Sequence, residues 1–250
     1  MRTRTLLLWL LAALLYLGLA RIAELDLHRL LVGLPKMGGW VLRAWPPDFS
    51  EFPQLLRRAG ETIAMATLGS TFGAILAAPL CIFAARNVSP DGWIYWPARS
   101  LLNLLRGIDS FVFALLFVVA VGLGPFAGVI GVALHSAGTI AKLWSETIET
   151  SEPGPLEAAA MTAASRIKLI SFAILPDALP SLASIALYTW EFNLRSSTVL
   201  GLVGAGGIGQ ELKNAVDLLD FPRVAAILLV ILTMVTIIDQ LSARVRRSLL

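Results

Sequence analysis

Several stretches of about twenty residues with almost no charge constrain this chain more than any other feature. A helix needs about 20 predominantly apolar residues to cross the roughly 30 Å hydrocarbon core of a bilayer. The chain has 250 residues, 57% of them hydrophobic, and its mean hydropathy is +0.77. A soluble domain is about 45–50% apolar. The sequence therefore predicts an all-α integral membrane protein.

Charge and cysteine content exclude several classes of protein. The net charge is +3 and the pI is about 9.3, but the basic residues are scattered between the apolar runs. Such scatter is typical of loops that orient a membrane protein, so we exclude nucleic-acid binding. The single cysteine, Cys81, lies in an apolar run. Neither a disulfide framework nor a metal-ligand cluster is therefore expected.

About six apolar segments could span the membrane. Residues 1–23 are predicted to form an N-terminal transmembrane anchor, with a cleaved secretory signal as the alternative. Residues 24–58 mix charges with Trp40 and Trp45, which favours an interfacial or periplasmic amphipathic segment. The main transmembrane domain should then cover 59–247. Its spans are expected at about 61–85, 101–121, 126–144, 178–199 and 223–241.

Small residues predict which spans can pack closely. Gly69 and Gly73 are four apart in the second span, where they form a smooth face that lets another helix approach. The fourth span has a comparable face at Gly128, Gly131 and Gly138.

The distribution of positive charge predicts the topology. Both termini, the 86–99 loop and the 145–176 region can lie on one side, which then holds most short-loop positive charge. The 122–125 turn on the other side has no charge. We expect the first side, with both termini, to be cytoplasmic. Arg57 and Arg58 are exceptions, because this arrangement places them on the opposite side.

A polar, small-residue stretch interrupts the apolar pattern at residues 153–180. A Pro-Gly-Pro turn ends the preceding segment, and Pro155 is suited to the first position of a new helix. Nearly all side chains from Leu156 to Ser165 are small, so a partner surface could approach the backbone. The residues alone leave two interpretations, a docking surface and a solvated connector.

This stretch resembles the EAA loop of the membrane subunits of bacterial ABC importers. Glu157-Ala158-Ala159 and Leu175-Pro176 match that pattern, whereas Ala163 replaces its Gly and Ala173 its Ile. In the family, the loop forms two short helices that dock into a groove of a cytoplasmic ATPase. The resemblance implies a coupling loop at about 150–176, with ATPase-coupling residues Glu157, Ala158, Ala159, Ala163, Ser165 and Arg166.

A glycine run at 200–209 allows two interpretations. Gly204, Gly206 and Gly209 have the GxGxxG spacing of a dinucleotide site. The preceding residues are a membrane span, and no alternating strand and helix pattern surrounds them, which argues against that interpretation. We instead predict a non-helical or re-entrant segment, which membranes tolerate inside protein or beside a cavity. Its gate glycines would be Gly204, Gly206, Gly207 and Gly209.

A narrower resemblance covers about residues 46–247. The run VLGLVGAGGIG, with Glu61-Thr62, Ala85-Arg86-Asn87 and VGLGPFAGV at 121–129, is similar to permeases of the phosphonate importer family, which includes phosphite and hypophosphite systems. Methionine importers share a related glycine run. This chain departs from the phosphonate pattern at Asp109 and Asp177. The resemblance implies a type I importer permease (MetI-like) fold in the inner membrane.

The same resemblance implies what the chain carries and what it works with. The cargo would be a small phosphorus oxyanion. The partners would be two copies of a separate ATPase that binds ATP and Mg, a second permease copy, a periplasmic solute-binding protein and membrane lipid. The chain has no GxxxxGK[ST] loop, so no ATP site, cofactor or enzymatic activity of its own is expected. The alternatives are a methionine-like substrate and an ATP-independent secondary carrier.

Ionisable residues within the spans are candidates for the substrate pathway, because charge at bilayer depth costs about 2.5–3.5 kcal/mol on translocon scales. His135 lies mid-span and is either hydrogen-bonded between helices or part of a pathway. Arg106 and Asp109 are three apart, which predicts a local ion pair at helical spacing.

Three polar residues interrupt the fifth span just before the glycine run: Glu191, Asn193 and Arg195. In one interpretation, Glu191 and Arg195 only neutralise each other at i,i+4. In the one we prefer, Arg195 faces a central path and guides an oxyanion, while Glu191 fixes its orientation.

Overall fold

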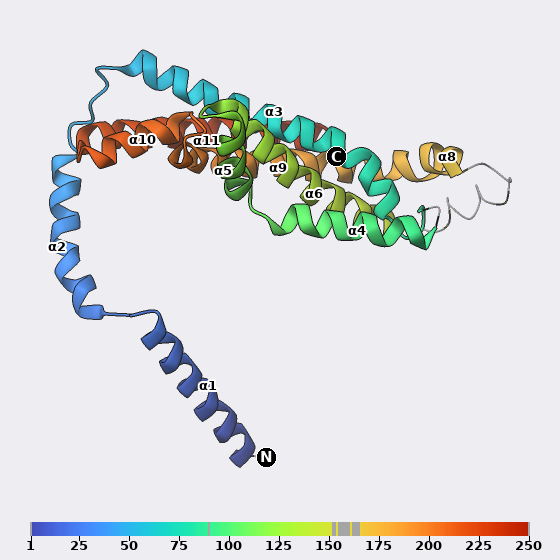
Figure 1. Cartoon of the computed structure of the whole chain (residues 1–250), viewed down its shortest axis with the longest axis horizontal. Coiled ribbons are helices and arrows are strands. Elements are labelled where there is room, and N and C mark those ends of the chain that lie inside the picture. Colours follow the sequence, from blue (N-terminus) through green and yellow to red (C-terminus); the bar gives the residue numbers. More distant parts are fainter. Residues whose placement is uncertain (1, 90, 152–153, 155–160, 162–165, 250) are drawn as a thin grey trace. The chain divides into compact units, whose positions relative to one another are not determined.

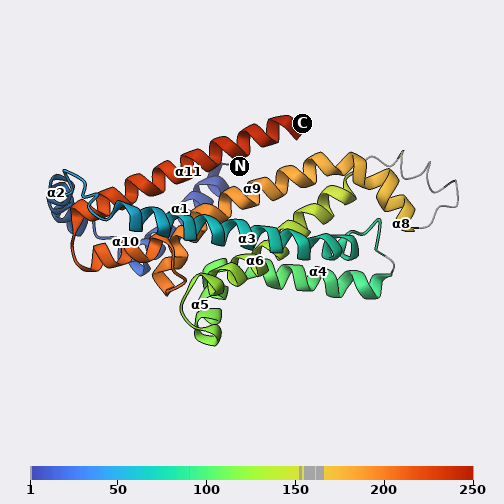
Figure 2. The ribbon, with the colours of Figure 1, turned by 90° about the horizontal axis from the view of Figure 1, so that it is seen from above.

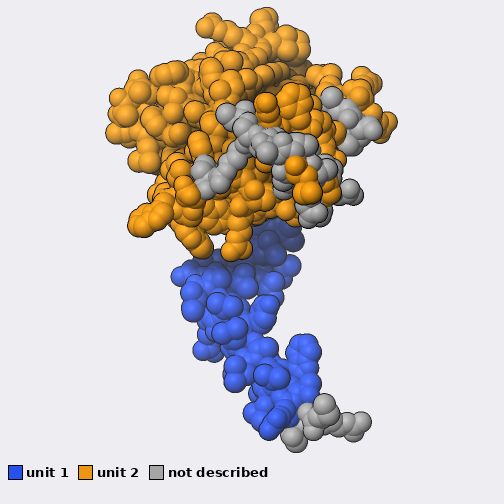
Figure 3. Space-filling model, turned by 90° about the vertical axis from the view of Figure 1, so that its right-hand side faces the viewer, with its two compact units in different colours: residues 1–46 blue, residues 47–250 orange. Residues whose placement is uncertain are grey.

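The computed structural model describes residues 2–89, 91–151, 154, 161 and 166–249. These residues form helices and turns, and no strand occurs among them. The chain divides into two compact units, residues 1–46 and 47–250 (Figure 3). The first contains α1 (Arg2–Ile22) and α2 (Leu27–Arg43).

The second unit is a helix bundle (Figures 1 and 2). It begins with α3 (Phe52–Ala84), α4 (Gly92–Gly107), α5 (Ser110–Val121) and α6 (Pro125–Glu149). After these four helices come α8 (Arg166–Leu169), a π-helical turn η1 (Ile170–Ile174) and α9 (Leu175–Leu200). A 3-10 turn η2 (Gly201–Val203), α10 (Ile208–Asp217) and α11 (Phe221–Leu249) complete it.

Among the described residues, four helical segments are long and apolar enough to cross a membrane: Arg4–Ile22, Phe52–Ala84, Pro125–Glu149 and Phe221–Ser248. The helices α4 and α5 qualify together as a fifth span, although they are bent by 85°. The helix α9 has 26 residues, a length of roughly 39 Å, but its proline, serine and charged residues keep it outside this count. The six expected spans thus become four or five by composition.

The predicted third span is not one continuous helix. The helix α4 ends at Gly107, and α5 begins at Ser110 after the extended residues Ile108 and Asp109. The Asp109 carboxylate accepts a hydrogen bond from the Phe111 backbone N–H at 2.8 Å, which caps the new helix. The predicted Arg106–Asp109 ion pair is wrong, because the helix that would align them stops between them.

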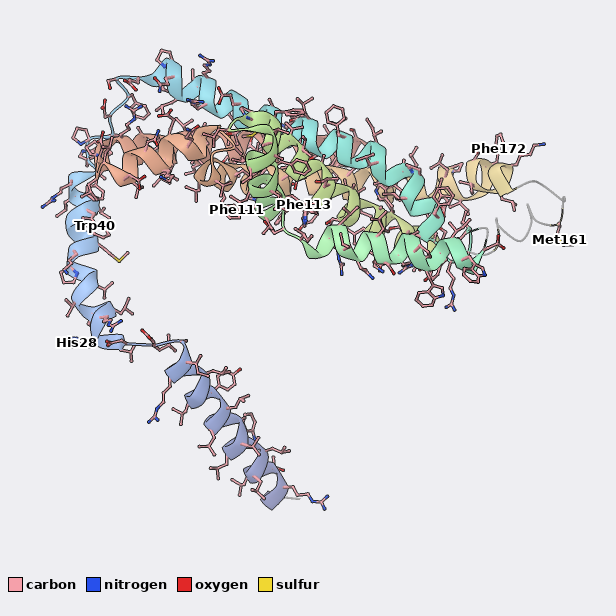
Figure 4. All side chains as sticks on the ribbon, in the orientation of Figure 1. His28, Trp40, Phe111, Phe113, Met161 and Phe172 are labelled. Carbon is pink, nitrogen blue, oxygen red and sulfur yellow. The ribbon has the colours of Figure 1, made fainter. Side chains whose placement is uncertain are left out.

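The segment predicted to lie at the membrane surface is partly helical. Asp26 caps α2 by accepting hydrogen bonds from the backbone N–H groups of His28 and Arg29. The side chains of His28 and Trp40 extend from α2 in Figure 4. The boundary between the compact units lies at Pro46–Pro47, and Leu55 is already buried in α3. Residues 52–58 therefore belong to the bundle.

The helix α6 is the centre of the bundle, since it packs against α3, α4, α5 and α9. Its contact with α3 depends on the predicted glycine face. A β-carbon at Gly69 would lie 2.6 Å from Val132 Cβ, and one at Gly73 would lie 2.5 Å from Ser136 Cβ. The close approach predicted from the glycine spacing is therefore confirmed.

Among the described residues, two large groups of buried side chains, and a smaller one around Ala114, Val132 and Leu200, hold the bundle together. One joins α3, α4, α6 and α9 around Leu102, Ile140 and Leu182. The other joins α3, α9, α10 and α11 around Leu55, Leu194 and Ile227. The helices α3 and α9 contribute to both groups, so each end of these two helices is held by its own apolar cluster.

We expect Gly69→Ala to destabilise the protein by about 1–3 kcal/mol, because its methyl group would overpack against Val132. Gly60→Ala, on the same helix, is the matched control, since nothing lies within 4 Å of its β-carbon position. That change should be neutral or stabilising by up to about 1 kcal/mol. Thermal unfolding of the purified protein in detergent measures both. Equal melting temperatures for the two variants would contradict the α3–α6 packing.

Candidate functional site

The end of α6 and the start of α8, which flank the predicted coupling loop in sequence, both lie at one end of the bundle (Figures 1 and 2). The Glu149 carboxylate accepts hydrogen bonds from Arg99 Nη2 and from the Arg86 backbone N–H, each at 2.6 Å. The Asn87 amide donates to the Ile148 carbonyl at 2.9 Å. Arg99 Nε also donates to the Ala84 carbonyl at 3.0 Å. The ends of α3, α4 and α6 are thus fixed together at this end of the bundle.

Most of the predicted coupling residues lie outside the described residues: Glu157, Ala158, Ala159, Ala163 and Ser165. The backbone of Arg166 begins α8. Two large apolar side chains at this end are exposed, Met161 by 89% and Phe172 by 80% (Figure 4). Sequence reasoning overlooked both. The signal was available, because they are large apolar residues within a polar, small-residue stretch.

The glycine run contains a break in the helical backbone between α9 and α10. Gly204, Gly206 and Gly207 have φ of 85°, 77° and 73°, a region that favours glycine. The Gly207 N–H donates to Glu61 Oε2 at 3.2 Å, and the Ile208 N–H donates to Thr62 Oγ1 at 2.9 Å.

The same run also contacts the uncharged turn at 122–125. The Gly124 N–H donates to the Gly204 carbonyl at 3.0 Å. The run therefore connects α3, the turn before α6, α9 and α10. The helical residues before it do not form the strand that a dinucleotide fold requires. Gating by Gly204, Gly206, Gly207 and Gly209 stays a prediction.

A charged cluster surrounds Glu211, which is only 5% exposed. Its Oε1 accepts hydrogen bonds from Gln54 Nε2 and Arg58 Nε, each at 3.2 Å. Its Oε2 accepts one from Arg223 Nη2 at 3.3 Å. Arg58 also pairs with Glu61 at 2.9 Å. Arg58, one of the two arginines that run against the predicted topology, is thus a structural partner of two carboxylates.

Two of the predicted pathway residues belong to an ionic network between α9 and α11. Arg195 pairs with Glu191 at 3.1 Å, as the i,i+4 spacing predicts, and with Asp239 at 3.2 Å. Glu191 also pairs with Arg246 at 2.9 Å. Sequence reasoning overlooked Asp239 and Arg246. Asp239 gave a signal, because it is a lone acid in an apolar run.

The other two predicted pathway residues make contacts inside the bundle. Asn193 is 1% exposed, and its amide donates to Ser70 Oγ at 2.8 Å and to Ser136 Oγ at 2.7 Å. It therefore lines no path in this structure. His135 Nδ1–H donates to the Ile108 carbonyl at 2.9 Å, because a carbonyl can only accept. That bond attaches α6 to the break between α4 and α5.

Residues 61–250 match the family described as binding-protein-dependent transport system inner membrane component. This chain belongs to that family. Its fold is that of a type I ABC importer permease. A chain of the MetNI methionine ABC transporter, solved in inward facing conformations, superposes with a TM-score of 0.69 at 23% sequence identity. The match covers 80% of this chain and 99% of that chain. The membrane location and the all-helical fold predicted from the sequence are confirmed.

Two relatives from Stutzerimonas stutzeri extend the similarity over nearly the whole permease. HtxC, assigned to a phosphite transport system, is 48% identical over 229 residues, which cover 92% of this permease and 81% of HtxC. PtxC, a phosphite transport system permease protein, is 40% identical over 232 residues, which cover 93% and 82%. The predicted resemblance to phosphonate and phosphite permeases is therefore confirmed.

The Glu211 cluster generates a stability prediction. Glu211→Ala should destabilise the permease by about 3 kcal/mol, because Arg58 and Arg223 would each lose a partner in a buried network. Asp217→Ala is the control on the same helix, since its pair with Lys213 is exposed and worth less than about 1 kcal/mol. Thermal unfolding in detergent compares the two. Similar losses would show that the Glu211 cluster does not hold α3, α10 and α11 together.

Proposed function

We propose that this permease is the membrane-spanning subunit of an ATP-driven importer for a small phosphorus oxyanion, such as phosphite, a phosphonate or hypophosphite. The observation that carries the substrate class is the similarity to two phosphite-system proteins over 92% and 93% of the chain. A methionine-like substrate is the alternative. It has weaker support, because the likeness to MetNI is a likeness of fold at 23% identity.

The proposed energy source is a separate ATPase. The sequence contains no GxxxxGK[ST] phosphate loop, so ATP and Mg would be bound by two copies of a partner chain. We further propose a second permease copy, a periplasmic solute-binding protein that delivers the substrate, and cytoplasmic termini. In this assembly the permease performs no catalysis of its own. An ATP-independent carrier is disfavoured, because the family is defined by dependence on a binding protein.

The ATPase would dock at the end of the bundle that holds the coupling loop. Exposed apolar side chains often mark protein interfaces, and Met161 and Phe172 are exposed at this end. The hydrogen bonds of Glu149 to Arg86 and Arg99 would brace this end against force from the ATPase. The EAA pattern assigns the contact itself to residues 157–166.

For the substrate pathway, the sequence-based candidate is Arg195 with Glu191. Arg195 keeps 43% of its side chain exposed, which supports contact with an anion. Its guanidinium is, however, shared between Glu191 and Asp239. An anion would have to compete with two carboxylates for the same donors. His135 would act through the α4–α5 break that it holds.

We expect Glu157→Lys to uncouple substrate uptake from ATP hydrolysis or to release the ATPase. Phe172→Ser should weaken binding of the ATPase by about tenfold or more, because it removes an exposed apolar anchor. Phe126→Ser is the matched control, since Phe126 is 65% exposed on α6 next to the 122–125 turn. Co-purification of the ATPase and substrate-stimulated ATP hydrolysis are the measurements. Unchanged assembly and unchanged stimulation in Glu157→Lys would refute the coupling assignment.

The reconstituted transporter should take up phosphite, and excess phosphonate should compete whereas methionine should not. Competition by methionine alone would favour the alternative substrate.

Mass measurement of the intact complex should find two copies of this permease and two of the ATPase. A single copy of this permease in the complex would disprove the homodimer.

A further inference from the structure

In the C-terminal half of α4, from Ser100 to Arg106, the exposed surface divides into two flanks of opposite character, whereas Trp93 and Trp96 are exposed nearer the start of the helix. Ser100, Asn103 and Arg106 are exposed and follow one another at three-residue spacing, which places them along one flank. The other flank is apolar, with Leu101 and Leu104 exposed by 43% and 58%. On the side of the helix that faces away from the exposed surface, Ala98 and Leu102 are buried in the bundle. Lipid chains can contact the apolar flank, whereas contact with lipid chains would leave the polar side chains of the other flank without hydrogen-bond partners.

The polar flank lies well inside the broken span. Arg106 is 14 residues from Gly92, where α4 begins, which corresponds to roughly 21 Å along the helix. Polar and ionisable side chains at such depth nearly always face the bundle interior or a water-filled cavity. The non-helical residues Ile108 and Asp109 follow directly. Irregular backbone at membrane depth is also confined to protein interiors and water-filled cavities.

Arg106 differs from Arg195 in its charge partners. Among the described residues, no carboxylate oxygen lies within 4.0 Å of the Arg106 guanidinium, whereas Arg195 contacts both Glu191 and Asp239. Asp109 caps the N-terminus of α5. The donors of Arg106 are therefore available to an anion.

We propose that the polar flank of α4, formed by Ser100, Asn103 and Arg106, lines the aqueous path and binds the oxyanion in transit. The Arg106 guanidinium offers a planar fork of donors that matches a phosphorus oxyanion. The Asn103 amide and the Ser100 hydroxyl add neutral donors along the same flank. The identity of the anion rests on the proposed function, but the presence of water along this flank does not.

Thiol labelling tests the path without reference to substrate. In a Cys81→Ser background, Ser100→Cys and Asn103→Cys should react with a charged methanethiosulfonate reagent in the assembled transporter. Leu101→Cys and Leu104→Cys are matched controls on the apolar flank of the same helix. We expect the polar-flank thiols to react at least about tenfold faster, because only a hydrated thiol forms the reactive thiolate. Equal rates on both flanks, or no reaction on either, would overturn the proposal.

Uptake of phosphite tests the anion site. Arg106→Gln should lower uptake at least about tenfold, the loss expected for a charge-assisted hydrogen bond, and leave assembly of the transporter unchanged. Arg106→Lys should restore part of the uptake because it keeps the charge. Arg195→Gln should have the smaller effect. Normal uptake by Arg106→Gln, or a larger loss with Arg195→Gln, would refute the anion site.

The two tests fail separately. If the unmodified transporter takes up no phosphorus oxyanion, the proposed function is wrong, and the labelling pattern still decides whether the polar flank lines a path. If uptake is normal but the polar flank does not react, the proposed function stands and the path lies elsewhere.

Discussion

The close approach of α3 and α6 is the contact on which the bundle depends. Lipid removes the hydrophobic effect as a force between helices, so association relies on van der Waals packing and hydrogen bonds. Gly69 and Gly73 provide the packing, since a β-carbon at either would collide with α6. Asn193 adds hydrogen bonds to Ser70 and Ser136 at the same seam. Because Asn193 belongs to α9 and bonds to both α3 and α6, the α3–α6 pair also fixes the position of α9.

The sequence predicted those parts of the fold that are encoded locally. Apolar length predicted most of the spans, glycine spacing predicted the α3–α6 seam, and three glycines predicted the break after α9. The break at Ile108–Asp109 was not predicted, although Arg106, Gly107 and Asp109 interrupt the apolar run there. Helical spacing of Arg106 and Asp109 then suggested an ion pair that the ended helix cannot form. The i,i+3 spacing of two charges predicts an ion pair only if the helix is continuous between them, and the sequence does not establish that continuity.

The candidate site was predicted less completely, because its partners are distant in sequence. Glu211 and Arg58 are 153 residues apart, and Arg195 and Asp239 are 44 apart. Nothing in the spacing of such residues joins them. Asn193 was grouped with Glu191 and Arg195 by proximity in sequence, yet it turns into the bundle while they face α11. The family resemblance supplied the coupling loop and the substrate class, which physical reasoning on the residues left open.

A transport path must bind its cargo strongly enough to admit it and weakly enough to release it. Arg195 would bind the cargo too weakly, because Glu191 and Asp239 already occupy its donors and an anion would have to displace them. An arginine with several further cations beside it would fail in the opposite way, by holding the anion. Arg106 lies between these limits: it has an available charge, neutral donors at Asn103 and Ser100, and the Asp109 carboxylate three residues on. Such a mixture suits passage of an oxyanion better than storage.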